Sequence, residues 1–300
     1  MATRKVKKQS EIQNFDSDQT HFINKGIVHQ TTLKNHINEA LFQNPFNVNY
    51  ILSSLPGLGK TWETEQALKL ITDNPPLIFN GTPSISAFIV DIATAVYLSG
   101  KKHLVVVLDD CDLLFDDKNI NIAKKMFDGS KVLKYTKQAK GLKPFCTDVQ
   151  WAAIESFADP TKAGFEVSLK NVTFLILTNR YLHTVNDVDG MEAGTAKASK
   201  ATDLYAIRRR NEYKAIEMPK LELWGYVANV VLNEQICEKW MPTITPAMKV
   251  QILDWIYTRW DRVTERNLSL VEKMTRDIVR YPKTYLDMWS SNYLQISTEK

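Results

Sequence analysis

Residues 50–61 have the sequence Tyr50-Ile-Leu-Ser-Ser-Leu-Pro-Gly-Leu-Gly-Lys-Thr61. A short apolar run leads into a glycine-rich turn, and a lysine and a threonine follow where a helix is expected to begin. A bound triphosphate needs backbone N–H groups that point inward from a tight loop, and it needs a cation beside its outer phosphates. The stretch therefore predicts a nucleotide-phosphate loop between a strand and a helix.

The loop follows the pattern G-x-x-x-x-G-K-[ST], except that Ser54 stands where the first glycine belongs. Lys60 is expected to contact the outer phosphates. Thr61 is expected to offer its hydroxyl to Mg²⁺, and the helix that begins there favours the anion. The alternative is an ordinary strand–turn–helix unit with a surface lysine. The predicted nucleotide-binding residues are Pro56, Gly57, Leu58, Gly59, Lys60, Thr61 and Trp62.

Apolar runs alternate with helical patterns on both sides of this loop. Residues 104–108 and 172–177 are almost wholly apolar, which is typical of strands buried on both faces of a parallel sheet. Right-handed crossovers between such strands build a doubly wound sheet, whose ligands bind at the carboxyl ends of the strands. The sequence predicts an α/β fold with a mainly parallel P-loop sheet, and helices over residues 31–42, 61–71, 85–98 and 120–127.

The pattern changes at Pro219, beyond which only helical periodicity remains. We expect an α/β nucleotide-binding domain over residues 31–219 and a small all-helical lid domain over residues 220–300. Residues 1–30 are expected to form a mobile basic arm. Residues 186–200 are rich in Gly, Ala, Ser, Asp and Lys, which predicts a flexible loop.

The composition is that of a soluble globular protein, with 44% hydrophobic and 24% charged residues among 300. A net charge of +4 permits a nucleic-acid partner without requiring one. The three cysteines lie far apart without metal-ligand spacing, which predicts reduced thiols. No apolar run is long enough to cross a bilayer. We therefore expect a cytoplasmic protein with no membrane partner.

Two carboxylates follow the first apolar run directly, at Asp109 and Asp110. A phosphate-loop ATPase needs a carboxylate at the end of a neighbouring strand to hold Mg²⁺, directly or through water. Asp109 is the predicted metal ligand together with Thr61, and Asp110 is expected to orient the attacking water. The alternative is a strand end that simply meets solvent.

These features together resemble the AAA+ ATPases. Gly57 to Thr61 are similar to the Walker A motif of that family, and residues 104–112 are similar to its Walker B motif. The resemblance departs from the family at Asp110, where glutamate is usual. It implies an α/β core with a helical lid, and ATP and Mg²⁺ as ligands. The stretch 164–174 further resembles phage and plasmid members.

The resemblance also implies three site residues that lie elsewhere in the chain. Asn179 corresponds to the sensor of the γ-phosphate, after the second apolar run. Arg210 corresponds to the arginine finger, with Arg209 as the second choice because three arginines are adjacent. Arg266 corresponds to the arginine of the lid that reaches the nucleotide. The catalytic set implied is Asp110, Asn179, Arg210 and Arg266.

The function implied is an ATPase that assembles into a ring or spiral and remodels a macromolecule, as a DNA replication motor or loader with nucleic-acid and protein partners. If the protein is viral, it acts in the host cytoplasm. An ATP-dependent assembly switch or scaffold with little turnover is an alternative, because Ser54 replaces a motif glycine and Asp110 is shorter than the usual glutamate. A protein unfoldase is a weaker alternative, because residues 79–81 do not form a convincing aromatic–glycine pore loop.

A lysine-rich region remains outside this scheme. No acidic residue lies between Gly129 and Phe145, and Tyr135 is interleaved with the basic residues. Lysines neutralise phosphates and aromatic rings stack on bases, so a pore loop or a loop that faces DNA is one interpretation. A solvated surface is the other. The lysines are Lys131, Lys134, Lys137, Lys140 and Lys143.

Overall fold

The computed structural model describes residues 15–100, 102–182, 184, 187–188, 191 and 195–295. The chain packs as two units. The sheet unit consists of residues 34–54 and 61–216, and the helical unit consists of the residues up to 33, residues 55–60 and the residues from 217 onward. Each unit has its own buried hydrophobic core.

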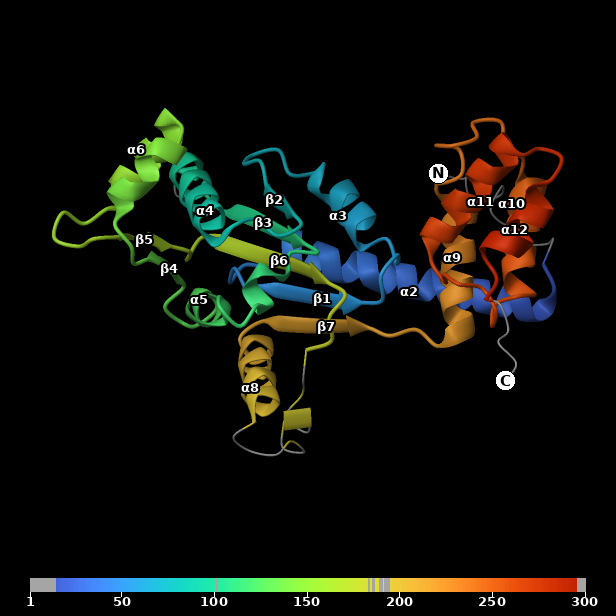
Figure 1. Cartoon of the computed structure of the whole chain (residues 1–300), viewed down its shortest axis with the longest axis horizontal. Helices are drawn as coiled ribbons and strands as arrows, with labels where there is room; N and C mark the ends of the chain where they lie inside the picture. Colours follow the sequence, from blue (N-terminus) through green and yellow to red (C-terminus); the bar gives the residue numbers. More distant parts are fainter. Residues whose placement is uncertain are drawn as a thin grey trace. The chain divides into compact units, whose positions relative to one another are not determined.

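The sheet unit is built on five parallel strands in the order β2-β3-β6-β1-β7, and Figure 1 shows these strands running in one direction. The predicted α/β class and parallel sheet are confirmed. The two apolar runs form the neighbouring strands β3 and β6, whose side chains are almost all buried. The strands are β1 (Tyr50–Ser54), β2 (Leu77–Asn80), β3 (Leu104–Asp109), β6 (Val172–Thr178) and β7 (Glu212–Ile216).

Helices connect these strands as the alternating pattern predicts. They are α3 (Lys60–Leu68), α4 (Ile85–Ser99), α5 (Ile120–Met126), which follows the 3-10 helix η1 (Asp112–Phe115), and α8 (Ala196–Arg209). The loop predicted over residues 186–200 is wrong for its last five residues, which belong to α8. Thr195 caps that helix, because its hydroxyl accepts a hydrogen bond from the Ala198 backbone N–H at 3.1 Å.

Residues 132–168, between α5 and β6, form a folded insert for which the sequence analysis predicted no elements. The insert contains an antiparallel strand pair and two helices, one of them α6, which packs beside α4 (Figure 1). Thr147 and Gln150 form a capping box at the start of α6. The elements are β4 (Val132–Tyr135), the 3-10 helix η2 (Ala139–Phe145), α6 (Asp148–Phe157) and β5 (Phe165–Ser168).

The helical unit draws on both ends of the sequence. Its core contains Trp224, Tyr226 and Trp289, together with Phe15 and Ile23 from the N-terminal region. The C-terminal helices are α9 (Lys220–Asn233), α10 (Pro246–Tyr257), α11 (Leu268–Arg280) and α12 (Tyr285–Asn292).

The mobile arm predicted over residues 1–30 is wrong for residues 17–30. These residues are the start of α2 (Ser17–Phe42), a helix predicted to begin only at residue 31. Ile23 is buried in the helical core and Phe22 packs against it, and this burial stabilises the first part of the helix. Residues 1–14 of the predicted arm lie outside the described residues.

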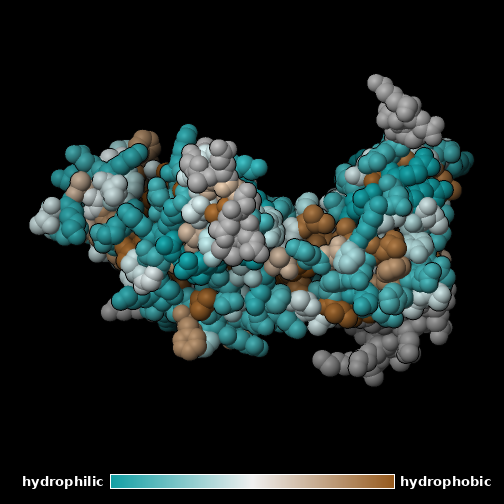
Figure 2. All heavy atoms as spheres, turned by 90° about the horizontal axis from the view of Figure 1, so that it is seen from below, coloured by the Kyte–Doolittle hydropathy of each residue, from teal (hydrophilic) through white to brown (hydrophobic). Residues whose placement is uncertain are grey.

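Hydrophilic residues predominate on the face of the molecule that Figure 2 presents, and the apolar residues on that face form small groups. Among the described residues, no helix combines the length and the apolar character that crossing a bilayer requires.

Candidate functional site

The glycine loop follows β1 directly and ends where α3 begins. Gly57 and Gly59 have φ angles of 77° and 70°, in the left-handed region that favours glycine. A Cβ atom on Gly57 would lie 2.4 Å from the Cβ of Asn267. Both the backbone conformation and the space therefore require glycine at this position, as a tight phosphate cradle does.

Lys60 is buried within this loop. The side chain is only 6% exposed, and its Nζ donates a hydrogen bond to the Leu55 carbonyl oxygen at 3.3 Å. The lysine thus folds back toward the beginning of the loop, which contradicts the alternative of a surface lysine. A buried ammonium group needs anionic or polar partners, and the Leu55 carbonyl oxygen is one of them.

The rest of the loop is held by contacts with the helical unit, to which residues 55–60 belong. Leu58 is 1% exposed, and its carbonyl oxygen accepts a hydrogen bond from the Tyr226 hydroxyl on α9. Pro56 is exposed, as is Thr61 in the first turn of α3, and Trp62 is half-buried beside it. The sequence analysis missed Tyr226 and Asn267, because no local pattern links positions so far from the loop.

The carboxyl edge of the sheet carries the predicted acidic residues. Asp109 is the last residue of β3 and is half-buried. Asp110 follows with a φ of 48°, an uncommon value for a residue other than glycine. Its backbone N–H donates to the Leu177 carbonyl oxygen at 3.1 Å. The chain therefore turns sharply at Asp110 while it stays attached to β6.

The structure brings two of the predicted site residues into direct contact at this edge. The Nδ2 of Asn179 donates a hydrogen bond to the Oδ1 of Asp110 at 2.8 Å. Ser53, near the end of β1, donates from its hydroxyl to the Arg180 carbonyl oxygen at 2.7 Å. This second bond ties β1 to the segment after β6. Ser53 was missed as a positioning residue, although a polar residue late in a buried strand is a usable signal.

The three adjacent arginines have different surroundings. Arg208 is half-buried, and its Nη1 donates to the Leu182 carbonyl oxygen at 2.7 Å. Its guanidinium carbon lies 4.2 Å from the ring centre of Tyr213. Arg209 and Arg210 are exposed. Arg208 is therefore engaged in contacts within the chain. Arg209 and Arg210, the two residues predicted as the arginine finger, are not held in this way.

Arg210 lies at the edge of the sheet opposite to Asp110. It ends α8 immediately before β7, and thus stands at the amino ends of the parallel strands (Figure 1). The pKa of the Asp128 carboxyl is lowered chiefly by a hydrogen bond from the Ser130 hydroxyl, and also by the nearby charge of Arg210. The structure does not bring Arg210 together with Asp110 and Asn179.

Arg266 lies in the helical unit, just before α11. Its Nε donates to the Trp260 carbonyl oxygen at 2.9 Å, and its Nη2 donates to the Asp261 carbonyl oxygen at 3.1 Å. The guanidinium group is half-buried. These bonds hold the loop before α11, so the predicted contact of Arg266 with a nucleotide remains a prediction.

The predicted metal ligands are the oxygen atoms of Asp109 and Thr61. Within the described residues, no group of three or more His, Cys, Asp or Glu side chains is placed to hold a metal. Mg²⁺ usually binds through one or two protein oxygens, with phosphates and waters as its other ligands. Asp109 and Thr61 both belong to the sheet unit, and their role as ligands of Mg²⁺ remains a prediction.

Comparisons with known proteins give no further assignment. No protein-family model matches the chain, and no curated protein matches it. The resemblance to AAA+ ATPases therefore depends on the motif residues of the sequence.

Proposed function

We propose that this protein binds and hydrolyses ATP with Mg²⁺ as an oligomeric P-loop ATPase of the AAA+ type. The observation that carries the proposal is the buried Lys60 inside a loop of two left-handed glycines. Few other ligands explain a lysine held in this way at the end of a parallel strand, since a phosphate group matches both the cation and the inward-facing N–H groups.

Each site residue has a role in this proposal. The backbone of the loop and the Lys60 ammonium bind the phosphates. Thr61 and Asp109 hold Mg²⁺, which neutralises phosphate charge when bound. Because the Asn179 amide occupies Oδ1 of Asp110, the other oxygen, Oδ2, accepts the hydrogen bond from the attacking water. Asn179 thus fixes the orientation of the carboxylate that positions the nucleophile.

The position of Arg210 supports a site completed by a second copy of the chain. Arg210 is exposed and lies at the opposite edge of the sheet from Asp110. A guanidinium group that stabilises charge on the γ-phosphoryl oxygens must lie next to them. We propose that Arg210 serves the nucleotide of a neighbouring subunit in a ring or spiral, and that Arg266 acts from α9–α12 as a lid.

The substrate that fits an ATPase of this type is a macromolecule, and we favour DNA in replication as that substrate. The activity would take place in the cytoplasm, or in the host cytoplasm for a viral protein. An unfoldase has less support, because Phe79 is buried, with its ring centre 5.0 Å from that of Phe88. That aromatic side chain is not presented to a pore.

The test compares Lys60→Ala and Asp110→Asn with a surface control, Lys69→Ala. We expect Lys60→Ala to lose nucleotide binding. We expect Asp110→Asn to bind ATP but to hydrolyse it about 10²–10⁴-fold more slowly. Lys69→Ala should match the wild type, because this lysine is exposed and its ammonium group donates a hydrogen bond to Gln66, outside the glycine loop. Wild-type binding and turnover in both site variants would refute the proposal.

A nucleotide-dependent switch with little turnover is the second candidate. The observation that favours it is the short Asp110 side chain, one of whose oxygens is already bonded to Asn179. A carboxylate so restricted and one methylene shorter than glutamate reaches a water molecule less easily. Steady-state hydrolysis with and without DNA discriminates between the two, because negligible turnover together with ATP-dependent assembly would identify the switch.

A further inference from the structure

The five lysines of the region 129–145 divide into two groups in the structure. Lys131 is half-buried, and its Nζ donates to the Asn47 carbonyl oxygen at 2.7 Å. Burial lowers the pKa of its ammonium group. Lys134 forms an ion pair with Glu166 at 2.8 Å. These two lysines stabilise the insert, and their charges are already satisfied.

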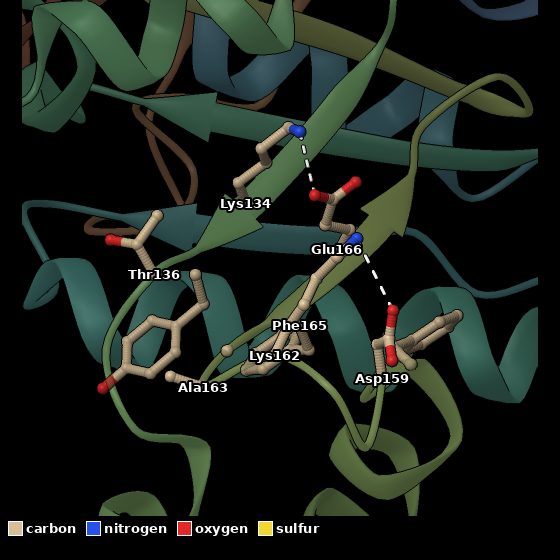
Figure 3. Close-up of a pocket in the computed structure, with 10 residues that line it drawn as sticks. Lys134, Thr136, Asp159, Lys162, Ala163, Phe165 and Glu166 are labelled. Atoms are coloured by element: carbon tan, nitrogen blue, oxygen red, sulfur yellow. Dashed lines mark hydrogen bonds and ion pairs between the residues drawn. The ribbon is translucent and has the colours of Figure 1, made fainter.

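A pocket of about 270 Å³ lies beside this ion pair, between β4, β5 and the residues that precede β5. Figure 3 shows Lys134 directed toward Glu166 and Lys162 directed toward Asp159 across its wall. Since each lysine has a carboxylate partner, the pocket has no net charge. It is therefore a poor candidate for binding phosphate.

The other three lysines, Lys137, Lys140 and Lys143, are exposed. Within the part of the chain that the structure describes, none of them forms an ion pair with a carboxylate. Lys140 and Lys143 belong to the 3-10 helix η2. Residues three apart in such a helix lie on the same side, separated by about 6 Å along its axis. The two ammonium groups therefore face solvent together.

The apolar residues of η2 fix this orientation. Ala139 and Leu142 are both 8% exposed and belong to the core of the sheet unit. The backbone N–H of Ala139 also donates to the Ala163 carbonyl oxygen at 2.9 Å. With one side of the helix held in the core, the lysines project from the other side.

An aromatic ring stands at the end of the same segment. Phe145 is 85% exposed, the largest exposure among the exposed large hydrophobic residues of the described chain. It follows Lys143, whose Nζ lies 5.3 Å from the ring centre of Trp151. A cationic segment that ends in an exposed aromatic ring offers phosphates and bases separate contacts.

We propose that residues 137–145 bind single-stranded nucleic acid. The three lysines contact successive phosphates, and Phe145 stacks on an unpaired base. An acidic protein would use the lysines but has less use for an exposed ring. A duplex would leave the ring without a base face. The inference extends the proposed function by naming the substrate class, although the binding itself needs no nucleotide.

The test measures the affinity of the full chain for a labelled 20-nucleotide thymidine DNA by fluorescence anisotropy, without ATP and across a salt series. The lysine variant is Lys137→Ala with Lys140→Ala and Lys143→Ala. The matched control removes the same charge elsewhere, as Lys69→Ala with Lys102→Ala and Lys118→Ala. All three control lysines are exposed residues of the sheet unit.

We expect the lysine variant to bind at least tenfold more weakly than the control. Its plot of log affinity against log salt concentration should be shallower by about 2, because each phosphate contact in a single strand contributes about 0.7. Phe145→Ala should bind about tenfold more weakly with an unchanged salt slope, and Phe145→Trp should retain binding. Unlabelled single-stranded DNA and RNA should both compete better than a duplex of equal length.

Equal affinities for the lysine variant and its charge-matched control would overturn the inference. The inference would also be overturned if a duplex or polyglutamate competed as strongly as the single strand. Strong competition by polyglutamate would indicate an acidic protein partner. Near-ultraviolet circular dichroism confirms that the variants are folded. Every protein is also assayed for ATP binding, so that a wild type that binds ATP normally but does not bind single-stranded DNA refutes this inference alone. Failure of ATP binding in the wild type refutes only the proposed function.

Discussion

At Gly57 the backbone has a φ of 77°, and the missing side chain leaves room for Asn267, the residue that caps α11. Two separate requirements therefore fall on one residue. A left-handed conformation costs an L-residue roughly 1–2 kcal/mol, whereas an overlap at 2.4 Å forces neighbouring atoms to move. The two effects can be separated by experiment, because Gly81 also has a left-handed backbone but has no neighbouring atom that a Cβ would overlap.

We expect Gly57→Ala to abolish nucleotide binding, and Gly81→Ala to retain it. Both glycines have positive φ angles, but a Cβ on Gly81 would meet no atom within 4 Å. Both variants should lose roughly 1–2 kcal/mol of stability from backbone strain, and only Gly57→Ala should also distort the loop. Nucleotide binding by calorimetry and thermal unfolding measure the two effects. Equal nucleotide affinity in the two variants would contradict the role of the loop.

Tyr293 is a single residue whose ionisation makes the stability of the folded protein depend on pH. Its hydroxyl donates to the Asp277 Oδ2 at 2.6 Å. Burial raises the pKa of the phenol above its ordinary value of 10.0, and the hydrogen bond to Asp277 raises it further. The neutral phenol therefore stabilises the folded state fully below pH 10, and this contribution disappears as the pH rises through the raised pKa.

We expect Tyr293→Phe to destabilise the protein by about 1 kcal/mol at pH 8, the value of one hydrogen bond. The difference from the wild type should shrink above pH 10, where the unfolded wild-type phenol ionises. Urea midpoints at pH 8 and pH 11 test this, with the exposed Tyr281→Phe as the control. A constant difference at the two pH values would show that the phenol does not titrate in this way.

The sequence analysis predicted the residues of the candidate site that follow local rules, and missed the neighbouring residues that depend on distant contacts. Gly57, Lys60 and Asp109 are marked by the phosphate-loop pattern and by the end of an apolar run. The hydrogen bond from Tyr226 to the Leu58 carbonyl oxygen joins positions far apart in the chain. No periodicity or turn chemistry encodes such a contact, because it arises only when the helical unit packs.

Between elements, α2 and α9 approach each other closely. A Cβ on Gly225 would lie 1.8 Å from the Phe22 carbonyl oxygen, and one on Gly26 would lie 2.3 Å from the Gly225 backbone. The two helices therefore touch backbone to backbone. Beside this crossing, the Asn229 Nδ2 donates to the Gln30 Oε1 at 2.7 Å in a buried setting.

We expect Gly225→Val to destabilise the helical unit by about 1–3 kcal/mol or more, as overpacking does when backbone must move. Gly141→Val is the control, because a Cβ there would meet no atom within 4 Å. Urea unfolding followed by tryptophan fluorescence reports on this core, which contains Trp224 and Trp289. Equal midpoints for the two variants would contradict the close crossing.

Elements of the insert show where sequence patterns fail. β4 and β5 have only four residues each, too few to establish an alternating pattern against a lysine-rich background. The capping box at Thr147 and Gln150 was a readable signal for α6 that the composition obscured. For β3 and β6 the apolar runs sufficed, because burial on both faces leaves few alternatives.

At the scale of the whole molecule, the residues of the candidate site lie at two opposite edges of the sheet. Asp110 and Asn179 lie at the carboxyl edge and Arg210 lies at the amino edge, a strand length or about 16 Å away by the usual rise per residue. A chain built in this way cannot bring its own Arg210 to its own Asp110, the carboxylate for which we propose a water-orienting role. Complementation between two inactive variants tests the consequence.

We expect Arg210→Ala to bind ATP normally and to lose turnover by about 10³-fold. A mixture of Arg210→Ala with Asp110→Asn should regain part of the wild-type rate, because each variant supplies the residue that the other lacks across the subunit interface. Arg208→Ala is unsuitable as the control, since that residue anchors Leu182. The surface variant Lys69→Ala serves instead. A mixture no faster than its components would exclude a finger shared between subunits.

The helical core has a consequence for the time course of folding during synthesis. Ile23 lies near the start of the chain, and its partners in the same core include Trp224 and Trp289. At about 5–20 residues per second, a ribosome needs roughly 10–40 s to pass from the first of these residues to the second. Throughout that interval the apolar side of early α2 is exposed while the sheet unit can already fold. The nascent chain therefore offers a chaperone a defined hydrophobic segment, which the last helices to be made will cover.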